Sequence, residues 1–225
     1  MYIYYNSEIY KYISQPNFIL KESIMSRQEV IAKLEVAIDE VVAHVESMGY
    51  AQAYGTEKRY LDGDMNYPYL HMNQEGIEVY SKFLKNLVTF SCIPYSTDLV
   101  NYKGCVVVLN TEALYMLDEI GRKFIYEHEL THFMNNDPII FTNKLMAEGE
   151  EGLKDLVEER EAICDIRAAK ATGINIDKYN FIKVECSKAL AASLGGVFNF
   201  TAKEILDMQK ETRQYKDTVE FLKNK

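Results

Sequence analysis

Features that mark membrane proteins and nucleic-acid-binding proteins are missing from this sequence. No segment approaches the roughly 18 consecutive apolar residues that a membrane-spanning helix needs. Lysine and arginine form no cluster, and the formal net charge of the 225 residues is −9, which argues against a surface for nucleic acid or anionic lipid. We therefore expect neither nucleic acid nor a membrane among the partners of this protein.

A secretion signal and closely paired cysteines are also missing. The first residues carry neither the basic segment nor the apolar stretch of a signal peptide. The four cysteines stand far apart, and none forms a C-x-x-C pair (Cys92, Cys105, Cys164 and Cys186). In a chain without a secretion signal such cysteines are expected to be reduced thiols, so we expect a cytoplasmic location.

The sequence does contain enough apolar material for a core. Its residues are 48% hydrophobic and 26% charged, which is ordinary for a globular chain of this length. We divide the chain into residues 1–100 and residues 101–225, and we expect the two regions to form one compact unit. The sequence does not indicate a function for the first region. A capping box at Ser26 and Glu29 opens a long amphipathic helix over 27–48 in the first region.

The periodicity of the apolar residues predicts helices around a small sheet. Residues 50–73 are rich in turn-forming residues, so His71 is expected in a loop. The fold class is α+β, with a small sheet packed on a helix at 118–134 and a largely helical C-terminal half. Further helices are predicted over 74–87, 112–117, 146–171, 177–193 and 201–223, and strands over 88–95 and 105–110.

The helix at 118–134 contains the pattern H-E-x-x-H, formed by His128, Glu129 and His132. Residues four apart lie one above the other on a helix, so the two imidazoles can bind one Zn²⁺. Glu129 is rotated by about 100° from His128, beside the metal rather than on it. That is the place of a general base acting on a water molecule at the metal. The alternative without a metal site is an amphipathic helix with two surface histidines.

A catalytic zinc site needs a third protein ligand, and several candidates compete. A metzincin pattern would require glycine and then histidine or aspartate at positions that are Asn135 and Pro138, so it fails. Cys105 resembles the Gly-Cys ligand of peptide deformylases, although a core cysteine is the simpler interpretation. Glu161 falls on the apolar face of the helix at 146–171, with Glu158 at the edge of that face.

Burial favours Glu161 among these candidates. A lone carboxylate on a buried face costs several kcal/mol unless it is neutralised, and a metal ion would neutralise it. Asp165 stands one helical turn beyond Glu161. Because histidines that bind a metal usually donate their other N–H to a carboxylate, we expect Asp165 to orient a metal-binding histidine.

These motifs resemble those of the gluzincin metallopeptidases. The sequence H-E-L-T-H at 128–132 followed by E-A-I-C-D at 161–165 is similar to the thermolysin-type arrangement, with Cys164 where serine is usual. Leu109-Asn110 and Arg122-Lys123-Phe124 are similar to the segment that precedes H-E-x-x-H in small intracellular ImmA/IrrE-like proteins. The E-x-x-A-D motif of a further group of intracellular metallopeptidases is also approached.

The resemblance covers about residues 104–172 and implies a zincin-like metal-binding core within 101–225. It implies that His128, His132 and Glu161 bind zinc and that Glu129 is the base. Thermolysin-type enzymes place a histidine that stabilises the transition state after the glutamate helix, whereas no histidine follows His132 here.

The function that the sequence predicts is zinc-dependent hydrolysis of a peptide bond in a peptide or protein substrate. Two alternatives stay open. One is a regulatory or sensor protein that binds a metal at the same residues without proteolysis. The other is a structural interaction module, for which the helix at 27–48 would be the partner surface. The sequence does not indicate an oligomeric state.

Overall fold

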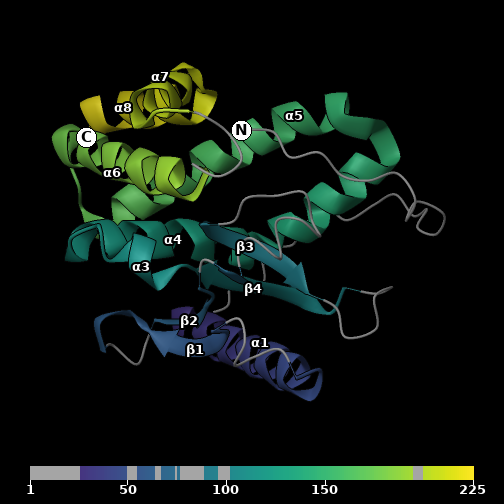
Figure 1. The fold of residues 1–225 in the computed structure, drawn as a ribbon. Coiled ribbons are helices and arrows are strands. Elements are labelled where there is room, and N and C mark those ends of the chain that lie inside the picture. Colours follow the sequence, from purple (N-terminus) through teal and green to yellow (C-terminus); the bar gives the residue numbers. More distant parts are fainter. Residues whose placement is uncertain are drawn as a thin grey trace.

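The computed structural model describes residues 26–49, 55–63, 67–73, 75–76, 89–95, 102–194 and 200–225. Within these residues the fold is a mixture of α and β structure, mostly helical, with one small sheet (Figure 1). The expected α+β class is confirmed at this level. The helix predicted over 74–87 lies almost entirely outside the described residues.

The sheet has four strands in the order β1-β2-β4-β3. Strands β1 (Glu57–Tyr60) and β2 (Pro68–His71) are antiparallel, β2 is parallel to β4 (Gly104–Leu109), and β3 (Phe90–Tyr95) is antiparallel to β4. Strands β3 and β4 agree with the prediction, whereas β1 and β2 were not predicted. Each of those two strands has only four residues, which is too short for alternation to stand out. His71 is therefore a buried strand residue, and its expected place in a loop is wrong.

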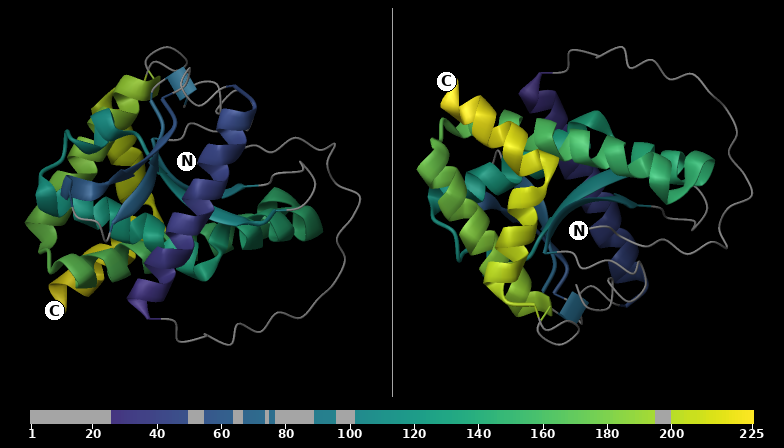
Figure 2. Two further views of the ribbon diagram at one scale, coloured as in Figure 1. Left: turned by 90° about the horizontal axis from the view of Figure 1, so that it is seen from below. Right: turned by 90° about the horizontal axis from the view of Figure 1, so that it is seen from above.

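Helix α1 (Arg27–Ser47) begins at the predicted capping box, in which Ser26 and Glu29 each accept a hydrogen bond from the other's backbone N–H. Its apolar stripe lies against β2 and β4. Figures 1 and 2 show α1 on one side of the sheet and the C-terminal helices on the other. The residues of α1 that enter the core are Val30, Leu34, Ala37, Ile38 and Val41.

Two helices separated by a single residue come next. After the short α3 (Thr111–Leu114), Asp118 caps α4 (Glu119–Asn135), and Asn136 ends it in the left-handed conformation at φ 56°. Helix α5 (Asp137–Thr172) starts at once, earlier than the predicted 146, because Pro138 suits the first turn of a helix. Gly149 interrupts α5 at φ 73° and ψ −171°, a conformation that glycine tolerates best.

Three helices complete the chain: α6 (Ile176–Leu194), α7 (Ala202–Glu211) and α8 (Arg213–Lys223). The single helix predicted over 201–223 is broken at Thr212, whose extended backbone ends α7 and whose side chain caps α8. Helix α8 packs on α5, and α7 packs on α6. The C-terminal helices therefore lie over the second half of α5, as Figure 1 shows.

One hydrophobic core joins these elements. It contains residues of α1 such as Leu34 and Ile38, the central strand β4, Phe124 and Tyr126 of α4, and Tyr179 of α6. Residues on both sides of position 100 thus contribute to the same core. Among the described residues, no helix is long and apolar enough to cross a membrane.

Candidate metal centre

The two histidines of the H-E-x-x-H pattern lie on the inward face of α4. His128 is 8% exposed and His132 is 5% exposed, so the alternative of two surface histidines is wrong. Their rings are 4.9 Å apart between centroids, and the two Nε2 atoms are 3.2 Å apart. The helical spacing thus brings one nitrogen of each ring to a common point.

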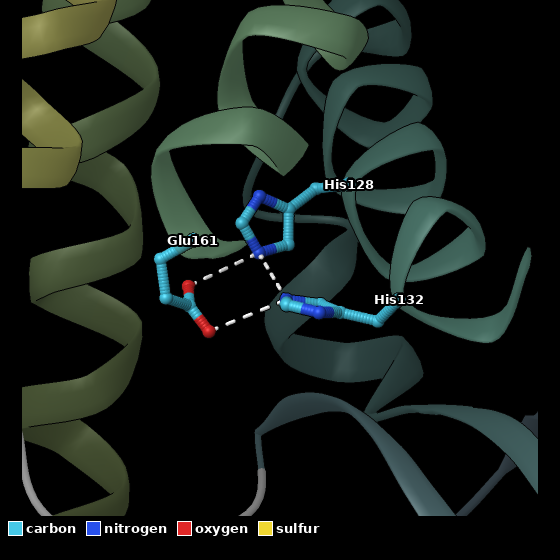
Figure 3. A group of neighbouring side chains, drawn as sticks. All are labelled: His128, His132 and Glu161. Carbon is cyan, nitrogen blue, oxygen red and sulfur yellow. Dashed lines mark hydrogen bonds and ion pairs between the residues drawn. The ribbon is translucent and has the colours of Figure 1, made fainter. Parts of the chain in front are cut away.

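Helix α5 brings Glu161 to the same point (Figure 3). Glu161 Oε2 lies 3.3 Å from His128 Nε2, and Glu161 Oε1 lies 3.3 Å from His132 Nε2. Gly149 leaves the helical conformation and the chain turns back there, so the second part of α5 returns alongside α4 (Figure 1). Of the residues predicted as ligands, all three therefore meet, and they form a group that can hold a metal ion.

Two aspartates fix which ring nitrogens carry protons. His128 Nδ1 lies 2.7 Å from Asp165 Oδ1, and His132 Nδ1 lies 2.9 Å from Asp137 Oδ2. An ionised carboxylate only accepts hydrogen bonds, so both Nδ1 atoms are donors. In the neutral imidazoles both Nε2 atoms then carry lone pairs, which face one another and the oxygens of Glu161. Such a cluster of acceptors is stable only with a cation or shared protons between them.

The pKa shifts of the three side chains also show that the site favours positive charge. Burial lowers the pKa of His128, but hydrogen bonds to Asp165 and Glu161 outweigh it and raise that pKa well above its usual value. Burial also lowers the pKa of His132, and the charge of Glu161 with the Asp137 hydrogen bond raises it well above the usual value. Burial raises the pKa of Glu161, yet the two histidines hold it well below its usual range. A bound metal ion would take the place of those protons.

Glu129 lies between the two histidines in sequence and is buried. Burial raises its pKa, while the charges of His128 and His132 and a hydrogen bond from the backbone of Cys92 in β3 act in the opposite direction. A carboxylate whose pKa is shifted upward is a better proton acceptor at neutral pH than an exposed one. Glu129 therefore has the environment of a general base at this site.

Asp165 is held by more than His128. Its other oxygen, Oδ2, accepts a hydrogen bond of 2.6 Å from the Tyr179 hydroxyl and lies 2.8 Å from Lys183 Nζ, both on α6. Burial raises the pKa of Asp165, but Lys183 and His128 lower it to about 2. The carboxylate thus stays ionised in the interior.

Sequence reasoning missed four polar residues of this site: Asp137, Tyr179, Lys183 and Gln214. Asp137 stands five residues after His132, next to the Pro138 that was considered as a position of the metzincin pattern. Tyr179 and Lys183 are four residues apart on α6, which was a usable signal for one shared partner. Nothing in the sequence connected Gln214 of α8 with Glu161, although Gln214 Nε2 donates a hydrogen bond of 3.3 Å to Glu161 Oε2.

A second group of buried donors adjoins the first and consists of His132, Asp137 and Cys164. Cys164 Sγ lies 3.5 Å from His132 Nδ1. Because His132 Nδ1 already donates to Asp137, this group offers fewer lone pairs than the first. Cys105, the deformylase-like candidate, belongs to neither group, and its thiol donates to Asn136 Oδ1 at 3.4 Å.

No protein-family model, curated protein or solved structure matches this chain. Two imidazole nitrogens and one carboxylate are donors that suit a transition-metal ion. The residues fit such an ion, since their lone pairs converge and both imidazoles are held in the required tautomer.

Proposed function

We propose that this protein is a zinc-dependent metallopeptidase of the gluzincin type, with a zincin-like core. His128, His132 and Glu161 would hold the Zn²⁺ ion, and Glu129 would be the general base. The observation that carries the proposal is the meeting of the three donor side chains beside a buried glutamate on the same helix.

The distances between the donor atoms support zinc. Zinc bonds of about 2.0–2.1 Å at tetrahedral angles place neighbouring ligand atoms about 3.3 Å apart. The two Nε2 atoms are 3.2 Å apart, and each lies 3.3 Å from a different oxygen of Glu161, Oε2 for His128 and Oε1 for His132. A Ca²⁺ site would instead gather six to eight oxygen ligands.

In the proposed mechanism, different residues bind the metal, transfer the proton and orient the histidines. A zinc ion held by His128, His132 and Glu161 would supply Lewis acidity for a carbonyl oxygen and for water. The Glu129 carboxylate accepts a proton from the attacking water and then gives it to the nitrogen of the leaving amine. Asp165 and Asp137 keep the protons of His128 and His132 on Nδ1, so that the lone pairs of both Nε2 atoms would be available to hold the ion.

Two variants test the proposal. We expect Glu161→Ala to lose stoichiometric zinc, as metal analysis of the purified protein would measure. We expect Glu129→Gln to keep zinc but to lose hydrolysis of a synthetic peptide library, with new termini read by mass spectrometry. Glu119→Gln, an exposed position on the same helix, is the matched control and should behave like the wild type.

The outcomes separate the candidate functions. A wild-type protein that holds no zinc would contradict the proposal and would favour the alternative of a structural interaction module. Zinc binding without cleavage of any library peptide would favour the regulatory or sensor protein. Cleavage by Glu129→Gln at the wild-type rate would overturn the assignment of the base.

A further inference from the structure

Two of the three proposed metal ligands are connected to the C-terminal helices. Asp165 divides its oxygens between two helices, with Oδ1 on His128 of α4 and Oδ2 on Tyr179 and Lys183 of α6. Lys183 is mostly buried and Asp165 almost fully, so neither charge has water as an adequate partner. The lysine therefore compensates the carboxylate, and the carboxylate sets the orientation of the His128 ring.

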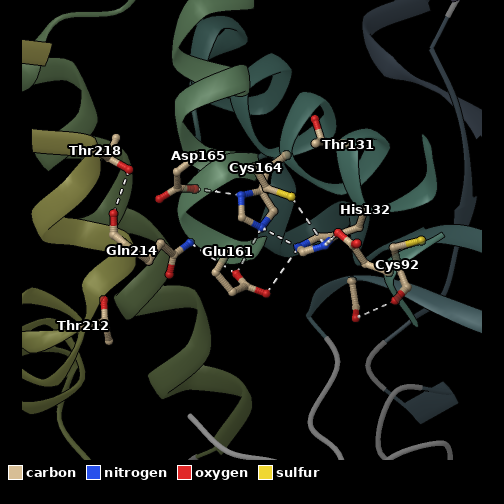
Figure 4. A network of polar contacts seen from close by, with 12 residues as sticks. Cys92, Thr131, His132, Glu161, Cys164, Asp165, Thr212, Gln214 and Thr218 are labelled. Atoms are coloured by element: carbon tan, nitrogen blue, oxygen red, sulfur yellow. Dashed lines mark hydrogen bonds and ion pairs between the residues drawn. The ribbon is translucent and has the colours of Figure 1, made fainter. Parts of the chain in front are cut away.

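Helix α8 reaches the third ligand directly. Gln214 Nε2 donates to Glu161 Oε2, the oxygen that lies 3.3 Å from His128 Nε2 (Figure 4). The Glu161 side chain is 32% exposed, so the packing around it leaves room for the carboxylate to rotate. A hydrogen bond from a neighbouring helix restricts that rotation and keeps the two oxygens facing the two histidines.

The two C-terminal helices also contact each other next to these residues. The rings of Tyr179 on α6 and Tyr215 on α8 are 5.7 Å apart between centroids. The Tyr215 hydroxyl donates a hydrogen bond of 2.6 Å to Asn180 Oδ1 of α6. Tyr179 itself donates to Asp165, and Tyr215 directly follows Gln214 in the chain. A shift of one helix would therefore be transmitted to the other.

We propose that α6 and α8 act together to position the metal ligands, with Lys183 and Gln214 as the positioning residues. Lys183 acts on His128 through Asp165, and Gln214 acts on Glu161. The inference rests on the proposed metal site and adds to it a role for the C-terminal helices, which lie outside the motifs of the sequence. Neither Lys183 nor Gln214 donates an atom to the metal.

The test compares variants of the full-length protein. Lys183→Met removes the charge that faces Asp165, and Gln214→Leu removes the hydrogen bond to Glu161 at similar volume. Tyr179→Phe removes only the hydroxyl that donates to Asp165, and it serves if Lys183→Met does not fold. Lys188→Met on α6 and Lys216→Leu on α8 are exposed controls, whose ion-pair partners Glu185 and Glu211 are not residues of the site.

Two readouts distinguish positioning from a general loss of stability. The dissociation constant for Zn²⁺ is measured by competition with a chelator, and the visible absorption spectrum is measured after substitution with Co²⁺. We expect about 10-fold weaker zinc binding in each site variant, as for other residues that support metal ligands, and an altered cobalt spectrum. Lys183→Arg should restore most of the affinity, and the controls should stay within about twofold of the wild type.

The results lead to separate conclusions. If the wild type binds neither zinc nor cobalt, the proposed function itself fails. If the wild type binds both and the folded site variants match it in affinity and spectrum, the positioning role is overturned while the metal site stands. An effect from one helix alone would overturn their joint action.

Discussion

His128 and His132 project from the same face of α4, yet the protein supports them in different ways. On the His128 side both oxygens of Asp165 are bound, one by the imidazole and the other by Tyr179 and Lys183. On the His132 side one oxygen of Asp137 has no hydrogen-bond partner among the described residues. The Nε atom of Arg160, also without a hydrogen bond there, lies 3.7 Å from it.

The difference follows from where each aspartate stands in the chain. Asp137 is placed locally, five residues after His132, by the turn at Asn136. Asp165 comes from a helix that returns after 37 residues, and its environment is completed by a third helix. A local partner needs little else to be in place, whereas the long-range partner is part of the packed core. We therefore expect the His128 side to contribute more to stability and to metal affinity.

The largest effect is expected from Asp165→Asn. This change leaves the buried ammonium of Lys183 without its opposing charge, a situation that typically destabilises a protein by about 3–5 kcal/mol. Zinc affinity should fall about 10- to 100-fold as the His128 ring loses its orientation. Urea denaturation of the metal-free protein and chelator competition measure the two effects. Asp155→Asn, exposed on the same helix, is the control.

Asp137→Asn should be less damaging. The amide oxygen can still accept from His132, and the facing Arg160 is partly exposed to water, so its charge remains solvated. We expect a loss of about 1–2 kcal/mol of stability and about 10-fold in zinc affinity. If this variant proves as unstable as Asp165→Asn, the comparison fails, and the local carboxylate matters as much as the network.

Much of the metal centre was predictable because its signals are local in sequence. The spacing of His128 and His132 and that of Glu161 and Asp165 each follow from the 3.6-residue period of a helix. The apolar residues around Glu161 on the helical wheel predicted that it faces inward; its side chain does face the two histidines but is 32% exposed rather than buried. That the two helices would meet was a further expectation, which depended on the family resemblance as well as on this pattern.

The remaining features depend on contacts that form only in the folded protein, and these leave weak signals in the sequence. Strand β2 pairs with β1, the short strand just before it, and with β4, which is distant in sequence. The sequence shows neither pairing, and so His71 was placed in a loop. Lys183 and Gln214 are ordinary polar residues of amphipathic helices until the packing of α6 and α8 is known. The early start of α5 was missed because Asn136 ends one helix and the next begins at the following residue.

The pH dependence of stability sharpens the comparison further. The pKa of Asp165 is about 2 in the folded protein and about 4 in an unfolded chain, because Lys183 and His128 favour its ionised form. A depressed carboxylate pKa stabilises the fold fully above the unfolded value, and this contribution is lost as the pH falls from about 4 to about 2. The shift corresponds to about 2 kcal/mol.

The stability difference between wild type and Asp165→Asn should accordingly narrow by about 2 kcal/mol in that pH range. Urea denaturation of the metal-free proteins at a series of pH values measures it. A difference that stays constant from pH 6 to pH 2 would show that the charge of Asp165 does not contribute in this way.

The smallest effect is expected from Cys164→Ser on the His132 side. The thiol is fully buried and lies 3.5 Å from His132 Nδ1, so it completes a second group of possible metal donors. Because His132 Nδ1 already donates to Asp137, it has no lone pair left for a second ion, and the thiol acts as a packing group.

We expect Cys164→Ser to lose at most about 1 kcal/mol of stability and to keep a zinc content of one ion per chain. Elemental analysis beside a thermal melt, with Cys186→Ser as the control, measures both. A wild-type protein that holds two ions, of which Cys164→Ser loses one, would mean that the His132 side binds a metal of its own.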